Sequence, residues 1–348
     1  MTRQDGETAN RPVGAAPASP AARLASSVVH PTSDFRLPTP DFVAYSGLIV
    51  DDIVLPDGRT FFNTLGGSAT HALVGMRVWS GSLGYFAAVG SDFDTRHCKL
   101  LEEMGVDLRG LLQRDGHRTA RAWQLFEPDE RRIEVFRTDI DKFYRMEPGL
   151  DEMPAEYFMA RGFHLCHGTL ADLRDVVTQL RAINATTRIM WEPTPLQTSG
   201  TVEEMRAVLA NVDVFSPDRG EAIQLTDRET PKDAIETLLE WGAKIVALRM
   251  GAEGSRVVTA GGESYRIPAV PASVVDTTGA GDAYCGGFLV ALANGEDVAR
   301  CGAHAAVSAS FAIEQFGVPT FDDRSQAEAE QRLAWALERV ETGSAVSW

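Results

Sequence analysis

From residue 42 onward, short runs of apolar, often β-branched residues alternate with segments whose apolar residues recur at helical spacing. The runs predict buried strands at 42–50, 83–89, 162–166, 187–191, 212–215 and 244–250. The segment 70–80 shows the helical spacing that separates such strands. Strands joined through helix-length segments pair in parallel, and helices cover both faces of such a sheet. The pattern therefore predicts a mainly parallel α/β sheet, with ligands bound beyond the carboxyl ends of its strands.

Two segments do not fit this alternation of strands and helices and instead predict β-hairpins, at 52–65 and 117–138. Their turns are expected at Pro56-Asp57-Gly58 and Pro128-Asp129-Glu130, because these residue types favour tight turns. Two hairpins inserted into a series of strands and helices can pair with each other, so we expect a small second sheet.

The two ends of the chain lack this pattern. The first forty residues include an Ala- and Pro-rich stretch at 15–22, and we expect a flexible tail that ends near Pro40. Arg3, Arg11 and Arg23 leave an organelle transit peptide as the alternative, against which Asp5 and Glu7 argue. The predicted domain then spans 41–340, and 341–348 form a C-terminal tail.

Composition narrows the class of protein. The 348 residues carry 33 Lys and Arg against 49 Asp and Glu, a net charge of −16, so a chain-wide basic surface for nucleic acid is absent. No apolar run reaches the ~18 residues that span a bilayer, so no membrane partner is expected. The four cysteines (Cys98, Cys166, Cys285 and Cys301) form no C-x-x-C pair, which predicts reduced thiols in a cytoplasmic protein.

The stretch 275–284, Val-Asp-Thr-Thr-Gly-Ala-Gly-Asp-Ala-Tyr, carries the clearest chemistry. A strand is expected at 273–275 and a helix from Ala283 to Asn294. Glycines at a strand-to-helix turn let backbone N–H groups approach an anion at the positive end of the helix dipole. A carboxylate such as Asp282 would repel a bound phosphate, unless it accepts the proton of a hydroxyl that attacks the phosphorus.

Taken alone, this stretch is equally well a structural Gly-rich turn with an Asp at a helix start. The chain has no G-x-x-x-x-G-K-[ST] sequence, which excludes a P-loop NTPase. No strand is followed by G-x-G-x-x-G at a helix start, so a Rossmann fingerprint is missing as well.

The motif and its surroundings resemble the ribokinase-like (PfkB) family of carbohydrate and nucleoside kinases. Similar segments occur in the family's order at 47–52, 66–71, 87–93, 216–221, 249–254 and 276–288. The resemblance implies a ribokinase-like fold, with a three-layer αβα core and a small β-sheet lid formed by the two hairpins. Within the family, 65–70 and 191–193 are most similar to a branch that includes the fungal killer-virus-maintenance proteins.

The resemblance assigns roles residue by residue. Asp282 matches the catalytic base, and Gly279, Ala280 and Gly281 match the anion hole. Asp52 matches the carboxylate that holds substrate hydroxyl groups, for which two acceptor oxygens suit a vicinal diol. The pair Gly66 and Gly67 matches a diglycine whose backbone lies against the substrate, although helix–sheet packing explains such a pair as well.

Three matched positions depart from the family's pattern. Glu221 matches a glutamate that acts on Mg²⁺ through water, but Asp218 stands where the family usually has Asn. Without the resemblance these two residues indicate a solvated helix start. His71 replaces an Asn that binds substrate, or it packs at a helix start, and Glu192 replaces an Asp or Asn that faces the active site.

The resemblance also implies where the nucleotide lies. Arg249, Gly251 and Gly254 match a loop that contacts ATP, and His304 matches a position near the adenine and ribose, unless it is a buried structural histidine. Asp276 and Thr278 match part of a loop that binds a monovalent cation in some relatives, which leaves open whether K⁺ is required.

Two further groups of residues have competing explanations. The aromatic residues Phe61, Phe62, Trp123 and Phe126 either line a sugar or base or fill the lid, which in the family often forms dimer contacts. The sequence His164-Leu-Cys-His167 suggests a metal site, but in a strand His164 and His167 point to opposite faces, which argues against one.

We therefore expect a cytoplasmic, ATP- and Mg²⁺-dependent kinase that phosphorylates a hydroxyl group of a sugar or sugar-like polyol. A nucleoside is the alternative acceptor, because the same motifs serve both substrate classes. A catalytically silent relative that binds or scaffolds is the alternative from a different class. A homodimer formed through the lid is the expected assembly.

Overall fold

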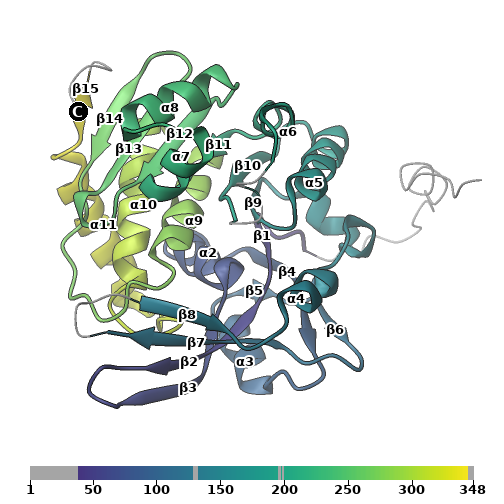
Figure 1. The fold of residues 1–348 in the computed structure, drawn as a ribbon. Coiled ribbons are helices and arrows are strands. Elements are labelled where there is room, and N and C mark those ends of the chain that lie inside the picture. The colour runs from purple at the N-terminus through teal and green to yellow at the C-terminus, as the bar shows by residue number, and fades with distance from the viewer. Residues whose placement is uncertain (1–37, 128–131, 195–196, 198–199, 344–348) are drawn as a thin grey trace, which may run out of the picture. The chain divides into compact units, whose positions relative to one another are not determined.

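The computed structural model describes residues 38–127, 132–194, 197 and 200–343, which belong to one compact unit. Within these residues, eleven strands form a large sheet and four form a second, smaller sheet (Figure 1). The expected N-terminal tail lies outside the described residues except for its last three positions, as does the turn expected at 128–130.

The large sheet has the order β15-β14-β13-β12-β11-β10-β9-β1-β4-β5, with β6 also paired to β4. Its strands from β12 to β5 and β6 run parallel, and β13, β14 and β15 continue it in antiparallel fashion. The parallel strands are β1 (Phe42–Ser46), β4 (Leu83–Gly90), β5 (Val106–Asp107), β6 (Leu111–Arg114), β9 (Gly162–Cys166), β10 (Arg188–Trp191), β11 (Val214–Phe215) and β12 (Ile245–Arg249). The others are β13 (Ser255–Thr259), β14 (Ser264–Ile267) and β15 (Glu341–Gly343).

Helices cover both faces of this sheet, as the pattern predicts. One layer holds α2 (Ser68–Arg77), α9 (Ala280–Ala293), α10 (Val298–Ala312) and α11 (Asp323–Leu337), with α3 (Thr95–Glu103) beside β5. The other holds α5 (Leu170–Ile183), α6 (Val202–Leu209), α7 (Arg219–Thr226) and α8 (Pro231–Glu240). The fold is thus an α/β fold with helices on both faces of a mostly parallel sheet and a small separate sheet, as the sequence led us to expect.

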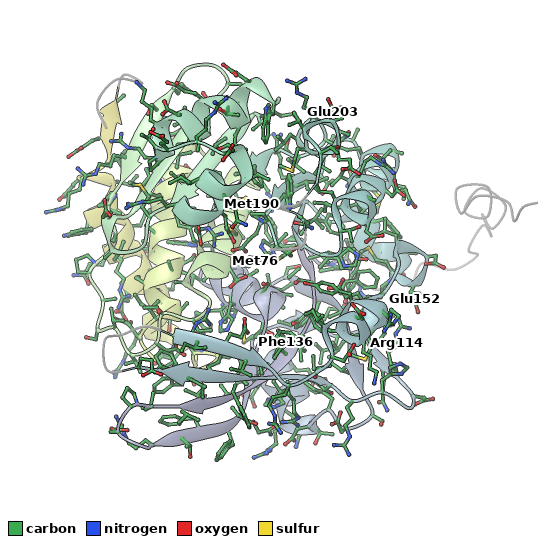
Figure 2. The ribbon with its side chains drawn as sticks, in the orientation of Figure 1. Met76, Arg114, Phe136, Glu152, Met190 and Glu203 are labelled. Atoms are coloured by element: carbon green, nitrogen blue, oxygen red, sulfur yellow. The ribbon has the colours of Figure 1, made fainter. Side chains whose placement is uncertain are left out.

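The side chains of strand β1 contribute to the hydrophobic cores on both faces of the sheet. Phe42 and Ala44 are buried against the α2 and α9 layer, whereas Val43 and Tyr45 are buried against the α5 layer. Side chains alternate between faces along a strand, so an uninterrupted apolar run fits a strand covered on both sides. Figure 2 shows Met76 and Met190 in the interior and Glu152 and Glu203 at the periphery.

The smaller sheet, which we call the lid, has the order β3-β2-β7-β8. The hairpin of β2 (Ile49–Val54) and β3 (Thr60–Gly66) and that of β7 (Ala120–Phe126) and β8 (Arg132–Phe136) pair through parallel β2 and β7. The helix α4 (Ile140–Met146) and the short 3-10 helices η1 (Leu150–Glu152) and η2 (Ala155–Met159) follow the lid in the chain.

Three local predictions were wrong. The run 42–50 is two strands in different sheets, because the chain turns at Gly47, where a Cβ would come 2.0 Å from the ring of Phe143. No strand precedes the Gly-rich motif: Val274 and Val275 are exposed, and backbone bonds to Ile313 O hold the segment instead. The expected C-terminal tail begins as β15, which pairs with β14.

Helices α2 and α9 approach each other closely through glycine. A Cβ on Gly286 would lie 2.1 Å from the carbonyl oxygen of Ala72, and one on Gly75 would lie 2.0 Å from the carbonyl oxygen of Ala283. The backbones are therefore in direct contact, which fixes the position of the first turn of α9.

We predict that Gly286→Ala lowers the free energy of unfolding by about 1–3 kcal/mol, because the added methyl group overpacks this contact. Urea denaturation measures the change. Gly81→Ala is the matched control, since nothing lies within 4 Å of its added Cβ, and it should change stability by less than about 0.5 kcal/mol. Equal stability of the two variants would contradict the packing account.

Candidate active site

Two cavities meet at the first turn of α9. The first, which we call the polar cavity, has a volume of about 520 Å³. It is lined by Asp282 of α9, Ser68 of α2 and Arg249 of β12, among others. The second, which we call the apolar cavity, has a volume of about 530 Å³, and Thr277 and Ala280 are among the residues that line it. The first turn of α9 thus contributes to both spaces.

The glycines of the motif permit two close approaches. Gly279, the N-cap of α9, has φ +76°, and a Cβ there would lie 2.1 Å from Cγ of His71. A Cβ on Gly281 would lie 1.8 Å from Nη1 of Arg249. The guanidinium group is therefore pressed against the backbone of the helix start, where unpaired N–H groups favour an anion.

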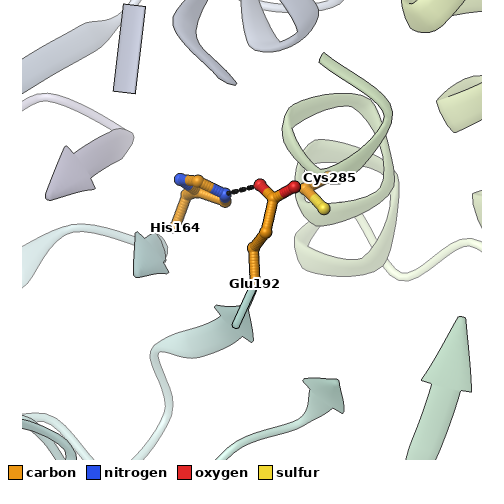
Figure 3. A group of neighbouring side chains, drawn as sticks. All are labelled: His164, Glu192 and Cys285. Carbon is orange, nitrogen blue, oxygen red and sulfur yellow. Dashed lines mark hydrogen bonds and ion pairs between the residues drawn. The ribbon is translucent and has the colours of Figure 1, made fainter. Parts of the chain in front are cut away.

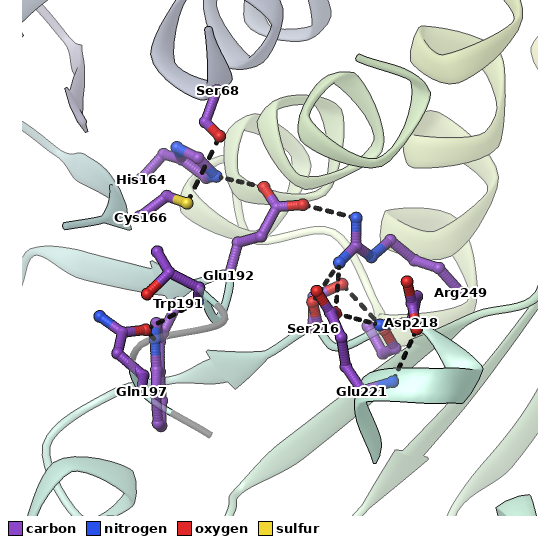
Figure 4. Close-up of polar contacts among 12 residues, drawn as sticks. Ser68, His164, Cys166, Trp191, Glu192, Gln197, Ser216, Asp218, Glu221 and Arg249 are labelled. Atoms are coloured by element: carbon purple, nitrogen blue, oxygen red, sulfur yellow. Dashed lines mark hydrogen bonds and ion pairs between the residues drawn. The ribbon is translucent and has the colours of Figure 1, made fainter. Parts of the chain in front are cut away.

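Glu192 joins the charged groups of the polar cavity. Figure 4 shows it between His164, whose Nε2 lies 3.0 Å from Glu192 Oε2, and Arg249, whose Nη1 lies 2.5 Å from Glu192 Oε1. Nη2 of Arg249 also donates to the carbonyl oxygen of Ser216 at 3.0 Å and lies 3.2 Å from Glu221 Oε2. Asp282 lines the same cavity, and the charge of Glu192 acts on it, so the matched base belongs to the same network.

The environment drives the two carboxyl groups apart in pKa. Burial and the charge of Glu192 raise the pKa of Asp282 well above its usual range, although Arg249 opposes the shift. Burial alone would raise the pKa of Glu192, but Arg249 and the bond with His164 lower it to about 2. Two neighbouring carboxyl groups resist carrying a charge each, so these opposite shifts favour a proton on Asp282 over one on Glu192.

Asp218 and Glu221 have a local structural role at the start of α7. Asp218 Oδ1 accepts the N–H of Glu221 at 2.8 Å, and Glu221 Oε2 accepts the N–H of Asp218 at 2.7 Å. This capping box begins the helix, as the sequence pattern allows. Both side chains also line the polar cavity, and burial raises the pKa of Glu221 to about 7 in spite of Arg249.

The apolar cavity contains two of the predicted nucleotide-binding residues. Gly251 and Gly254 line it beside the 3-10 helix η4 (Gly251–Glu253), with φ of +59° and +85°. Its remaining walls are small or apolar, from the segment around Val274 and from α10. Such a slot suits a planar heterocycle.

His304 lies elsewhere. Its Nδ1 is 2.8 Å from the carbonyl oxygen of Arg300, and its ring packs on Trp79 at 4.4 Å between centroids. The face of α10 toward the apolar cavity instead carries Ala306, Ala309 and Ser310. A structural histidine, the alternative for this position, fits these contacts.

Asp52 also lies away from the polar cavity. Its carboxylate pairs with Arg137 and accepts the N–H of Asn63 at 3.0 Å. The neighbouring Asp51 points to the opposite face of the lid, where Gln124 Nε2 donates to Asp51 Oδ1 at 3.0 Å and also to Glu134, a residue of the polar cavity. Burial raises the pKa of Asp51 to about 7. Alternation along β2 therefore selects Asp51 as the carboxylate on the cavity side.

The diglycine contacts protein backbone and side chain. A Cβ on Gly67, at φ +90°, would lie 2.8 Å from Gly47 O, and one on Gly66 would lie 2.0 Å from Asp51 Oδ2. Their close packing places Ser68 in the polar cavity beside Asp282, where it accepts from Cys166 Sγ at 3.4 Å. Sequence reasoning missed Ser68, although its place directly after Gly66-Gly67 was the available signal.

His71 is buried against Gly279, and neither ring nitrogen has a hydrogen-bond partner among the described residues. Burial lowers its pKa to about 4, so the ring is neutral at physiological pH. Asp276 is also buried, and its Oδ1 accepts the N–H of Thr278 at 2.8 Å. The role of Asp276 and Thr278 in binding a cation stays a prediction.

The aromatic residues named from the sequence are not those of the polar cavity. Phe61 and Phe126 pack on Phe316, while Phe62 and Trp123 are exposed. The cavity's aromatic wall is instead formed by Phe136 of β8 with Phe143 and Tyr144 of α4. Phe143 lies 5.4 Å from Phe136 and 5.1 Å from Tyr144 between ring centroids. Helix α4 has no distinctive motif, so no sequence signal indicated it.

The two histidines of 164–167 diverge, as strand geometry predicts. His167 contacts Tyr45 and Glu147, whereas His164 contacts Glu192. Ligand atoms of His164, Glu192 and Cys285 do lie within 4.8 Å of one another (Figure 3). Arg249 already neutralises Glu192, and a metal ion would be repelled by that guanidinium. The cluster is better explained by the contacts of Glu192 with His164 and Arg249, which belong to the charged groups described above.

The chain matches a known protein family over most of its length. Residues 40–323 match the pfkB family carbohydrate kinase model. A cytidine kinase of Thermococcus kodakarensis is 25% identical over 263 residues, covering 75% of this chain and 91% of that protein. A 5-dehydro-2-deoxygluconokinase of Halalkalibacterium halodurans is 28% identical over 283 residues, covering 75% of this chain and 83% of that protein. A structure from E. coli, described as a candidate Ribokinase II with ATP and Mg²⁺, has a TM-score of 0.69 at 20% identity and covers 85% of this chain and 99% of that one.

The charge network predicts an acid limb in the pH profile of any reaction in which Asp282 is the base, the role expected from the sequence. Asp282 must then lose its own proton first, and its raised pKa means that kcat/KM falls as the pH drops through that pKa. Glu192→Gln removes the negative charge that raises this pKa, so the acid limb should move to lower pH by on the order of one unit.

The profile is measured as kcat/KM at saturating ATP across pH, with Glu103→Gln on the exposed side of α3 as control. The control should reproduce the wild-type profile. An acid limb that stays in place, or moves to higher pH, in Glu192→Gln would contradict the coupling of the two carboxyl groups.

Proposed function

The chain belongs to the pfkB family of carbohydrate kinases, and on that premise we propose that it transfers the γ-phosphoryl group of ATP to a hydroxyl group of a neutral nucleoside. Enzymes of this family are phosphotransferases with a hydroxyl acceptor. The observation that carries the proposal is the first turn of α9, which lines both cavities. Donor and acceptor can therefore meet at Asp282. Assignment to the killer-virus-maintenance branch stays a prediction.

In the proposed mechanism, ATP lies with its base in the apolar cavity and its phosphates at the start of α9. Asp282 accepts the proton of the acceptor hydroxyl while the oxygen–phosphorus bond forms and the bond from phosphorus to the departing ADP oxygen breaks. The N–H groups at Gly279–Gly281 and the Arg249 guanidinium stabilise the charge that develops on the transferred group.

The donor set suits Mg²⁺, which prefers oxygen ligands and keeps several waters. The capping box and Arg249 use Asp218 Oδ1 and Glu221 Oε2, which leaves the second oxygen of each carboxylate for a water of the hydrated ion. The E. coli protein of the same fold holds ATP with Mg²⁺. When bound, the ion would neutralise charge on the triphosphate.

Charge in the polar cavity favours a neutral acceptor. Six carboxyl groups line it, from Glu134, Glu147, Glu192, Asp218, Glu221 and Asp282, and the facing cations are Arg132 and Arg249. A second anion beside these carboxylates would be repelled in a partly buried site. Sugar acids and sugar phosphates are thus disfavoured.

The aromatic wall favours a nucleoside over a simple sugar. Phe136, Phe143 and Tyr144 present ring surface on the side of the cavity formed by β8 and α4. A planar base gains stacking energy on such rings, while Asp51 or Glu147 can accept from ribose hydroxyls. The sugar or polyol favoured by the sequence lacks a planar group to occupy this wall.

An acceptor panel tests the proposal. Purified protein is given Mg-ATP with nucleosides, neutral sugars and polyols, sugar acids and sugar phosphates, and ADP release and ³¹P NMR of the product are measured. We expect the highest kcat/KM with a nucleoside, and values at least about tenfold lower for anionic acceptors.

Preference for an anionic acceptor would contradict the charge argument, and preference for a neutral sugar would contradict the role of the aromatic wall. ATP binding without turnover across the panel would instead support the catalytically silent relative. The placement of Asp282 in a cavity large enough for an acceptor disfavours that alternative.

The outer face of the lid supports a homodimer. Asp52, Trp123 and Val135 are aligned across β2, β7 and β8, on the face opposite Asp51 and Gln124. Trp123, Val135, Ile133 and Phe62 are between 38% and 65% exposed, which leaves an apolar surface on these strands. We propose that a second copy of the chain covers it. Among the described residues, no helix is both long and apolar enough to cross a membrane.

We predict that the wild-type protein is a dimer by light scattering coupled to size exclusion, and that Val135→Lys shifts it to monomer by placing a charge in the interface. Ile183→Lys on the exposed face of α5 is the control and should remain dimeric. A monomeric wild type at micromolar concentration would contradict the assignment.

A further inference from the structure

The first residue of β8 reaches from the lid to the anion hole. Nη1 of Arg132 donates to Thr278 Oγ1 at 3.1 Å. Thr278 directly precedes Gly279, the N-cap of α9, and its own N–H is held by Asp276. A cation of the lid is thus tied to the loop that would bind the transferred phosphoryl group.

Two arginines enter the polar cavity from different sheets. Arg249 comes from β12 of the large sheet and Arg132 from β8 of the lid, and both line the cavity with Asp282. Together with the start of α9, they place two guanidinium groups and free backbone N–H groups around one volume. Carboxyl groups also line this cavity, so the two arginines are the cations that an anion at the start of α9 would meet.

The two guanidinium groups differ in how their charge is balanced. Glu192 and Glu221 pair with Arg249, so the charge of that residue is compensated within the protein. Among the contacts that the structure describes, the guanidinium of Arg132 donates to a neutral hydroxyl. A cation beside the positive end of a helix is unfavourable unless an anion lies between them. Asp51 lies close enough for the charge of Arg132 to oppose the rise that burial causes in its pKa, but the hydrogen bond of the guanidinium is to the Thr278 hydroxyl. An anion bound at the start of α9 would therefore gain a direct charged partner in Arg132.

We propose that Arg132 is a catalytic residue that contacts the transferred phosphoryl group, with a phosphoryl oxygen taking the place of Thr278 Oγ1. This inference rests on the proposed function of the same site. Arg132 exchanges no proton: the acceptor proton passes to Asp282, ADP leaves with the electron pair of the broken bond, and the guanidinium stabilises charge on the phosphoryl oxygens. An arginine of this kind acts mainly on kcat.

The position of Arg132 on the lid links acceptor binding to catalysis. The same strand carries Glu134 and Phe136 into the polar cavity, two and four positions further on. An acceptor that contacts these side chains holds β8, and hence Arg132, against the anion hole. Acceptor binding and the placement of Arg132 at the start of α9 thus depend on the same strand.

The test compares Arg132→Gln with Arg59→Gln, which removes an exposed arginine at the tip of the other lid hairpin. We expect Arg132→Gln to lower kcat by about 10²–10³-fold, while the ATP dissociation constant from calorimetry changes by less than about threefold. Added guanidinium ion should restore part of the lost kcat, which a merely structural role of the side chain would not allow. Arg59→Gln should match the wild type in all three readouts.

A kcat within about threefold of wild type in Arg132→Gln, or an increase in acceptor KM at unchanged kcat, would overturn the proposal. Arg132→Lys serves if the glutamine variant folds poorly, because it keeps the charge and loses the planar fork, and kcat between the wild-type and glutamine values is expected. If the proposed function itself is wrong, the wild-type protein phosphorylates no acceptor. If only this inference is wrong, the wild type is active and the variant is unaffected.

Discussion

The buried guanidinium of Arg249 is the interaction on which the candidate site depends. It lies against the backbone at Gly281, pairs with Glu192 and Glu221, and donates to the carbonyl oxygen of Ser216. A residue larger than glycine at position 281 would displace it. Without this charge, Glu192 would be an uncompensated buried carboxylate, and such groups become protonated or destabilise the fold. The network therefore sets both the charge of the anion hole and the protonation of Asp282.

The fold supplies this network with residues from four distant segments of the chain. Glu192 follows β10, Arg249 ends β12, Ser216 follows β11, and Asp282 lies in α9. Parallel strands end at the same edge of the sheet, which brings the first three together. The close backbone contact of α9 with α2 then fixes the fourth. Site chemistry in this protein is thus a direct result of sheet topology and helix packing.

The sequence was sufficient for the parallel core, the two hairpins and the Gly-rich helix start, because these depend on local periodicity and on turn residues. It assigned Asp52 and not Asp51 to the substrate, since a match along the sequence ignores which face of β2 each residue occupies in the lid. It also missed the aromatic wall, because α4 faces the cavity only through tertiary packing. His304 was assigned to the nucleotide, although the helix face that carries it packs on Trp79 instead. Resemblance locates positions along the chain, and packing decides where their side chains point.

The most direct test of the account is single-turnover phosphoryl transfer by Asp282→Asn, followed by quenched flow with the preferred acceptor bound. Asparagine keeps the size of the side chain but cannot accept the acceptor's proton. The account predicts a transfer rate lower by about 10²–10⁴-fold, with ATP affinity from calorimetry changed by less than about threefold. Near-normal transfer by this variant would show that another group takes the proton, and would contradict the central role of Asp282.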